Sequence, residues 1–185
     1  MNIENSKGTL QNLLLKVQEQ NNRSADFLAS TNNLQKMTND EGKPQIVIEA
    51  AGGEPTRILD VNDHAFGQIA QNVEIDTRTA RRLQEKVPHE YDGVVNALFQ
   101  KEPTNRMVRT FLDTDETTGT ARAFVSDKFK TFDNVNLLNA SLPQLMESDA
   151  QWQVVNGTVT DKRLYIRLKS EVQTGEAAVG DFMAN

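Results

Sequence analysis

The chain contains no cysteine, which excludes disulfide bonds, thiolate metal sites and a cysteine nucleophile. It also lacks any apolar run long enough to span a bilayer, and residues 1–20 have neither the charged start nor the apolar core of a secretory signal. These absences favour a reducing compartment. We therefore expect a cytoplasmic protein without membrane contact.

Histidine is scarce, and the motifs of common enzymes are missing. His64 and His89 fall in no zinc-binding spacing, and there is neither a nucleophile elbow nor a phosphate-binding loop. Each histidine fits a capping or surface role. Carboxylates are plentiful, so a magnesium-dependent nuclease stays open as a distant alternative, although no tight acidic pair selects candidate ligands. We predict a binding protein and no enzyme, with no catalytic residue, cofactor or metal.

The overall composition is that of a folded domain with an acidic balance. The chain has 185 residues, of which 37% are hydrophobic and 25% are charged, and this is too apolar for a chain disordered throughout. The formal net charge is -6, which argues against the broad basic surface of most nucleic-acid binders. Any contact with nucleic acid must therefore use a local patch.

Hydrophobic spacing divides the first half of the chain into three stretches. Apolar residues in 10–17 recur at helical spacing and predict a short helix. Residues 25–60 alternate between short apolar runs and turn-forming residues, which is typical of short strands. Three consecutive helices are then expected between about 62 and 102. They form a helical insertion.

The boundaries of these helices are marked by capping residues and prolines. Asn62 or Asp63 is placed to cap the first helix, and Asp76 to cap the second. Pro88 interrupts the second helix and Pro103 ends the third.

The second half of the chain predicts a hairpin, a helix and a second hairpin. Residues 106–126 contain two strand-like runs around an acidic turn, a helix runs from Asp133 to Leu145, and 152–170 contain two further runs. The fold class is therefore α+β. It comprises an antiparallel sheet with a hairpin–helix–hairpin core at about 105–172, a helical insertion at about 62–102 and an N-terminal strand-rich lobe, all in one domain of 25–185 behind an N-terminal arm of 1–24.

The sharpest chemical pattern lies in the last strand-like run. Strand alternation puts Leu164, Ile166 and Leu168 on one face. The opposite face then carries Arg163, Tyr165, Arg167 and Lys169. Cations neutralise phosphates and an aromatic ring stacks on bases, so this face has the ingredients of a platform for a single strand. An ordinary solvated sheet face has the same pattern.

Two further groups of cations occur earlier. One surrounds the first hairpin, interleaved with phenylalanines: Arg106, Arg109, Arg122, Lys128 and Lys130, with Phe111, Phe124, Phe129 and Phe132. If the two hairpins share a sheet, this group continues the row of cations on the last strand. Four carboxylates nearby in the sequence could instead pair with it: Asp113, Asp115, Glu116 and Asp127. The other group, at the start of a helix, fits a solvated helix face better than a phosphate site: Arg78, Arg81 and Arg82.

Four segments carry a resemblance to a known family. They are FGQIA at 66–70, VRTFL at 108–112, ARAFVSDKFK at 121–130 and FDN at 132–134. From about Asp26 onward the chain resembles the phage- and plasmid-borne family catalogued as domain of unknown function nine-three-two, which implies a bacterial host cytoplasm. Family members continue with further strand-rich sequence where this chain stops at 181–185. The resemblance therefore implies a domain that is incomplete or is completed by a partner.

The order of a helix, Trp152 and antiparallel strands is similar to the core of the Rad-fifty-two and Red-beta superfamily. That similarity implies a protein that coats and pairs complementary single strands as a ring or filament, although architecture does not fix function. We predict a single-stranded DNA binding or annealing homo-oligomer of phage or plasmid recombination or replication. The alternative is a counter-defence or assembly module in which Asp113 to Glu116 hold a basic phage or host protein, or mimic DNA.

Overall fold

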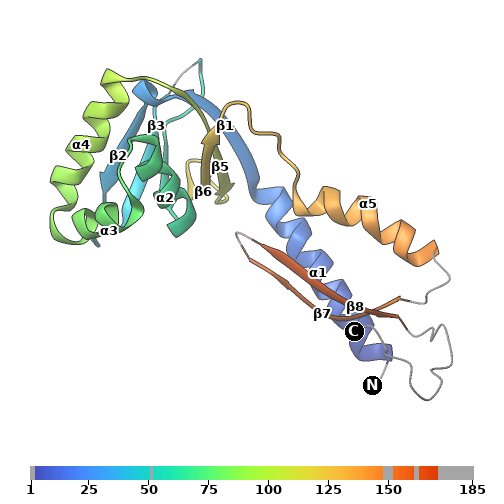
Figure 1. The fold of residues 1–185 in the computed structure, drawn as a ribbon. Coiled ribbons are helices and arrows are strands. Elements are labelled where there is room, and N and C mark those ends of the chain that lie inside the picture. The colour runs from blue at the N-terminus through green and yellow to red at the C-terminus, as the bar shows by residue number, and fades with distance from the viewer. Residues whose placement is uncertain (1–2, 51, 148–151, 161–162, 171–185) are drawn as a thin grey trace. The chain divides into compact units, whose positions relative to one another are not determined.

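The computed structural model of the chain describes residues 3–50, 52–147, 152–160 and 163–170 (Figure 1). The chain forms two compact units, and each is described by itself. The smaller unit is Met1–Asn21 with Phe132–Asn185, and the larger unit is Asn22–Thr131. The predicted α+β class is confirmed, because both units combine helices with mostly antiparallel strands.

The larger unit is built on a six-stranded sheet in the order β1-β5-β6-β4-β3-β2. Its strands are β1 (Ser24–Ser30), β2 (Leu34–Thr38), β3 (Pro44–Ile48), β4 (Arg57–Val61), β5 (Asn105–Leu112) and β6 (Thr118–Ser126). Neighbouring strands are antiparallel except β4 and β6, which are parallel. The three predicted N-terminal strands are present as β1, β3 and β4, and β2 is an additional strand where an Asn-rich break was expected. All four extend the sheet of the first hairpin and do not form a lobe apart.

The six-stranded sheet is strongly curled. Its two edge strands, β1 and β2, follow each other in the chain and are joined only by the short 3-10 helix η1 (Thr31–Asn33). The guanidinium of Arg57 in β4 lies 4.3 Å from the ring centroid of Phe27 in β1, although two strands separate them in the sheet. Only a sheet that curls back on itself brings these side chains together.

Three helices connect β4 to β5, as the sequence predicts. They are α2 (Asp63–Asn72), α3 (Thr77–Lys86) and α4 (Pro88–Lys101). The side chain of Asn62 accepts hydrogen bonds from the backbone N–H of His64 and Ala65, and Asp76 caps α3. Pro88 is the first residue of α4, where its missing N–H has no cost.

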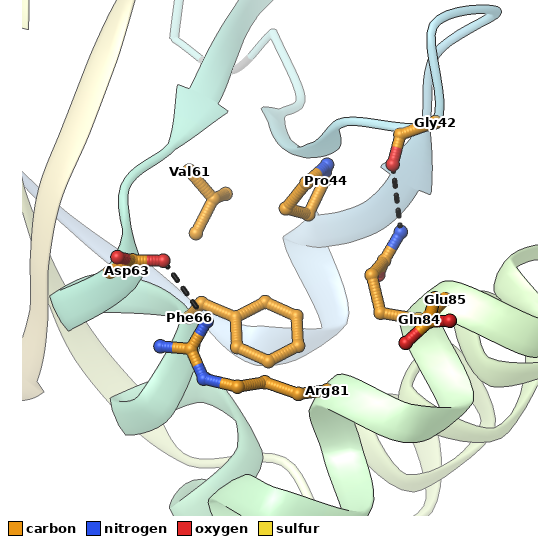
Figure 2. A pocket seen from close by; sticks show the side chains of 8 residues that line it. All are labelled: Gly42, Pro44, Val61, Asp63, Phe66, Arg81, Gln84 and Glu85. Carbon is orange, nitrogen blue, oxygen red and sulfur yellow. Dashed lines mark hydrogen bonds and ion pairs between the residues drawn. The ribbon is translucent and has the colours of Figure 1, made fainter.

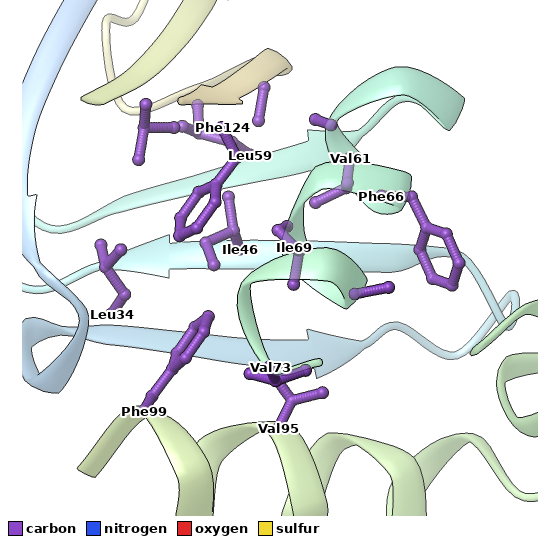
Figure 3. Packing of buried hydrophobic residues seen from close by; sticks show 14 of the residues in the cluster. Leu34, Ile46, Leu59, Val61, Phe66, Ile69, Val73, Val95, Phe99 and Phe124 are labelled. Carbon is purple, nitrogen blue, oxygen red and sulfur yellow. The ribbon is translucent and has the colours of Figure 1, made fainter. Parts of the chain in front are cut away.

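One face of the sheet and these helices enclose the hydrophobic core (Figure 3). Ile46 and Leu59 from the sheet are fully buried, as is Val95 from α4. The rings of Phe99 and Phe124 stack with their centroids 6.0 Å apart and so join α4 to β6. Burying each large apolar side chain contributes about 2 kcal/mol, so this cluster sets how the helices cover the sheet.

The smaller unit contains two helices and a two-stranded sheet. Its elements are α1 (Ile3–Arg23), α5 (Asn134–Glu147), β7 (Trp152–Val159) and β8 (Leu164–Ser170). The first helix is longer than the predicted 10–17, and it buries Leu13 and Val17, one turn apart. Pro143 lies inside α5, so the Asn139 carbonyl receives no backbone N–H from that position.

The two hairpins do not share a sheet. The predicted order of hairpin, helix and hairpin is confirmed as β5–β6, α5 and β7–β8, but β7 and β8 pair only with each other. The outer edges of β5 and β6 are occupied by β1 and β4, so neither edge is open to the second hairpin. Within the described residues, no helix is long and apolar enough to cross a membrane.

Candidate nucleic-acid interface

The last strand has the alternation that the sequence predicts. Leu164, Ile166 and Leu168 are half-buried, whereas the residues between them are exposed. Tyr165 is 54% exposed. We call the exposed set the basic strand face; it consists of Arg163, Tyr165, Arg167 and Lys169.

The neighbouring strand adds polar, uncharged side chains to the basic strand face. Asn156 is the cross-strand partner of Arg167, and Thr158 is that of Tyr165. Both are exposed. Across 152–160 and 163–170, the described part of this hairpin, no Asp or Glu occurs. The face therefore presents three cations without an acidic neighbour on its own two strands.

One pair on this face is held in place by a hydrogen bond. The Nη1 of Arg163 donates to the phenolic oxygen of Tyr165 at 2.8 Å. This bond raises the pKa of the Arg163 guanidinium, a group that is charged at any physiological pH even without it. The contact also fixes the tip of the tyrosine ring beside a positive charge, an arrangement suited to a base above the ring and a phosphate at its edge.

The other two cations have no competing partner among the described residues. Arg167 and Lys169 make no ion pair and no side-chain hydrogen bond with that part of the chain. Both are exposed. An anionic ligand could therefore reach them without breaking a contact to any described residue.

The arginines of the first hairpin are placed differently. Arg109 is only 7% exposed, and its Nε donates to both carboxylate oxygens of Asp26 at 3.0 and 3.1 Å. Arg122 donates from Nη2 to the Ser24 hydroxyl at 2.8 Å, and its guanidinium lies 4.6 Å from the centroid of the Phe111 ring. Both arginines hold β1 to the hairpin, and Arg109 has its charge neutralised by Asp26.

The remaining predicted cations of this group lie at the ends of the hairpin strands. Arg106 is half-buried and donates from Nε to the Thr104 hydroxyl at 3.3 Å. Lys128 and Lys130 are exposed in the turn after β6 and make no ion pair with any described residue. All of this group belongs to the larger unit, whereas the basic strand face belongs to the smaller one. The two groups of cations therefore lie on or next to two different sheets and not on the single sheet that the sequence suggested.

The acidic turn of the first hairpin is used mainly for its own structure. Asp115 accepts hydrogen bonds from the backbone N–H of Thr117 and Thr118, which lowers the pKa of its carboxyl. Asp113 pairs with Arg23 at 3.0 Å. The alternative function as a module for a basic protein partner draws on this turn and remains a prediction.

A buried polar cluster escaped the sequence analysis. Lys36 in β2 is 1% exposed, and its Nζ donates to the carboxylate of Asp92 and, at 2.7 Å, to Gln84. Thr38 also donates to Asp92. Burial lowers the pKa of Lys36, and the contact with Asp92 opposes that shift. Alternation along β2 places Lys36 on the same face as buried Leu34, a signal that could have revealed an inward-pointing lysine.

A cavity of about 280 Å³ lies beside this cluster. Figure 2 shows Phe66 and Arg81 on one side of it and Gln84 near the turn that carries Gly42. Arg81 pairs with Asp63 at 3.0 Å, and Gln84 donates to the Gly42 carbonyl at 3.4 Å. All four cations of α3 are exposed; Arg81 pairs with Asp63 and Lys86 with Glu85, whereas Arg78 and Arg82 make no ion pair with a described residue.

Both histidines are exposed, as the sequence indicates, but His89, expected in a loop after Pro88, lies in the first turn of α4. His64 is the second residue of α2, and the His89 side chain is 79% exposed near the start of α4. The Nδ1 of His89 is 3.9 Å from a carboxylate oxygen of Asp92. Over the described ranges, no three His, Asp or Glu side chains are grouped to hold a metal ion.

Comparisons with protein-family models, with curated proteins and with solved structures find no significant match to this chain. The resemblances stated from the sequence therefore remain predictions. The segment 121–130 that carries most of the family resemblance lies in β6 and the turn that follows it.

Proposed function

We propose that this protein binds single-stranded DNA through the basic strand face. The observation that supports this most directly is the absence of any carboxylate on the described part of the β7–β8 hairpin, next to three exposed cations and an exposed tyrosine. A solvated sheet face normally mixes both signs of charge. A face of one sign attracts a polyanion even when the whole chain has a net charge of -6.

The spacing of the face suits an extended strand of nucleic acid. Residues two apart on a strand lie roughly 7 Å from each other, so Arg163, Arg167 and Lys169 form a row of positive charges. Tyr165 lies within this row and offers a ring to one base. Contacts to phosphates leave the base edges open, which is what pairing with a complementary strand requires.

Three cations on one protomer give weak binding, so the proposal includes a homo-oligomer. A ring or filament would align many such faces along one strand and multiply their effect. The proposed setting, taken from the family resemblance, is phage or plasmid recombination or replication in the cytoplasm of a bacterial host.

The test is a salt titration of binding to fluorescently labelled oligo(dT), followed by anisotropy. Each phosphate contact on a single strand contributes roughly 0.7 to the slope of log affinity against log salt. We expect Arg167→Ala with Lys169→Ala to weaken binding at low salt and to reduce that slope by roughly 1.4. The matched control is Arg78→Ala with Arg82→Ala, which removes two exposed charges from α3.

Two results would contradict the proposal. One is an affinity that does not change with salt. The other is an equal loss in the control variant, which would indicate a general effect of net charge and no defined face.

A further inference from the structure

The turn after β6 holds an exposed aromatic ring that the basic strand face does not include. The backbone N–H of Phe129 donates to the Ser126 carbonyl at 3.0 Å, and that of Lys128 donates to the Ser126 hydroxyl at 3.1 Å. Both bonds tie the turn to the end of the sheet. Phe129 is therefore placed by a defined turn, although it is 45% exposed.

The ring itself is also held. The guanidinium of Arg109 lies 5.8 Å from the centroid of the Phe129 ring, within range of a cation–π contact. Arg109 is in turn fixed by its two bonds to Asp26. The ring thus contacts a buried arginine whose charge is neutralised by the partly exposed Asp26, and the exposed fraction shows that ring surface is left open to solvent.

Exposure alone would carry little weight, because single exposed apolar residues are common on protein surfaces. Two additional features set Phe129 apart. Its ring is fixed by a side chain that is itself fixed, so little conformational entropy is lost when a ligand stacks on it. Its neighbours Lys128 and Lys130 are exposed and make no ion pair with described residues.

We infer that Phe129 is a base-stacking platform for single-stranded nucleic acid, with Lys128 and Lys130 contacting the phosphates on either side of the stacked base. This inference rests on the proposed function and adds a second contact point, in the larger unit. Arg109 acts as a positioning residue that supports the ring. A stacking platform accepts any base, so it contributes affinity without sequence preference.

The decisive experiment uses a tryptophan in place of the ring. In a Trp152→Phe background, which removes the one natural tryptophan, the Phe129→Trp variant is titrated with oligo(dT) and with an abasic oligomer of the same length. We expect oligo(dT) to quench the tryptophan and the abasic oligomer to leave it unchanged. Anisotropy measured in the same titration reports binding independently of stacking.

The outcomes separate this inference from the proposed function. Binding by anisotropy without quenching by oligo(dT) overturns the platform and leaves the basic strand face standing. Quenching with no effect of Arg167→Ala and Lys169→Ala would support the platform and overturn the basic strand face. Absence of binding to either oligomer overturns both.

Variants of Phe129 in the otherwise unchanged chain measure how much the ring contributes to the affinity for oligo(dT). Phe129→Ala should weaken oligo(dT) binding by roughly 5- to 150-fold, the range that loss of one stacked base implies. Phe129→Leu keeps an apolar side chain without a π face and should lose as much, whereas Phe129→Tyr should bind within about twofold of the parent. Unchanged circular dichroism shows that each variant is folded.

The matched control is Phe132→Ala. Phe132 is 65% exposed three residues further on, and it makes no ring or cation contact with described residues. We expect its loss to change affinity by less than about twofold. An equal loss in Phe132→Ala, or a loss in Phe129→Ala that is as large for the abasic oligomer, would show that stacking on a held ring is not the mechanism.

Discussion

The buried pair of Lys36 and Asp92 should be a principal determinant of the stability of the larger unit. The two side chains are 1% and 11% exposed, and they join β2 to α4. Asp92→Asn keeps the shape of the side chain and removes its charge. The ammonium of Lys36 then has no anion, and removing one partner of a buried pair costs about 3–5 kcal/mol.

Neighbouring contacts refine this estimate. Gln84 still accepts a hydrogen bond from Nζ of Lys36, and the ammonium lies 4.6 Å from the centroid of the Tyr91 ring. These two contacts still stabilise part of the buried charge. We therefore expect a loss of about 3 kcal/mol, at the lower end of that range. Lys36→Met should also destabilise, because it leaves the Asp92 carboxylate with Thr38 as its main partner.

The double variant Lys36→Met with Asp92→Leu is the informative control. It replaces both charges by apolar groups, which is often close to neutral, so its stability should lie within about 1 kcal/mol of the parent. The assay is urea unfolding followed by circular dichroism, with hydrogen exchange of β2 and α4 peptides to report on the larger unit alone. If the loss of stability in the double variant equals the sum of the losses in the two single variants, Lys36 and Asp92 are not coupled and the reasoning is refuted.

The Lys36–Asp92 pair also predicts how the stability of the Asp92→Asn variant depends on pH. Burial lowers the pKa of Lys36 below its ordinary value of 10.5, and the contact with Asp92 opposes this. Asp92→Asn removes the opposing contact, so the pKa falls further. The unfolded chain then binds more protons than the folded one, and stability rises with pH up to that ordinary value. The loss in Asp92→Asn should thus be smaller at about pH 9 than at about pH 7, whereas Lys36→Met should show no such recovery.

Two further predictions concern the same unit. Gly119→Ala should lower the free energy of unfolding by roughly 2 kcal/mol or more, because at a φ of 146° its Cβ would collide with the Phe111 carbonyl oxygen. The control Gly93→Ala, in an open position of α4, should leave that free energy unchanged or raise it. Equal urea midpoints for the two variants would contradict this prediction. Burial, aided by the charge of Asp92, raises the pKa of Tyr91 from 10.0 to about 12. The stability that this shift contributes to the folded state is therefore fully present below pH 10.0 and is lost as the pH rises toward about 12. Relative to Tyr91→Phe, the parent should lose about 1 kcal/mol between about pH 9 and about pH 11, and parallel stability curves would show that Tyr91 titrates normally.

Local signals in the sequence were sufficient for most of the elements, although β2 was missed and α1 is longer than predicted. Asn62 and Asp76 cap helices because a short polar side chain reaches the free N–H groups of the first turn. Pro88 separates α3 from α4 because it has no N–H to continue the earlier helix. The alternation along β8 correctly assigned its exposed and half-buried residues, since neighbouring side chains in a strand point to opposite faces.

The partners of these elements depended on contacts far apart in the chain. The predicted cation Arg109 binds Asp26, which is 83 positions away, and a strand pattern alone does not show which carboxylate will lie opposite. Lys36 and Asp92 are 56 positions apart and were missed for the same reason.

The amino-acid sequence by itself determined the α+β class, the capped starts of α2 and α3, and which side chains share the exposed face of β8, because each follows from residues within a few positions of one another. Only the tertiary structure decided that the two hairpins lie in different sheets, that Arg109 is neutralised and supports Phe129, and that a lysine is buried beneath α4. Strand pairing and charge burial depend on how distant segments compete for the same sheet edges and the same core. No local pattern records the outcome of that competition.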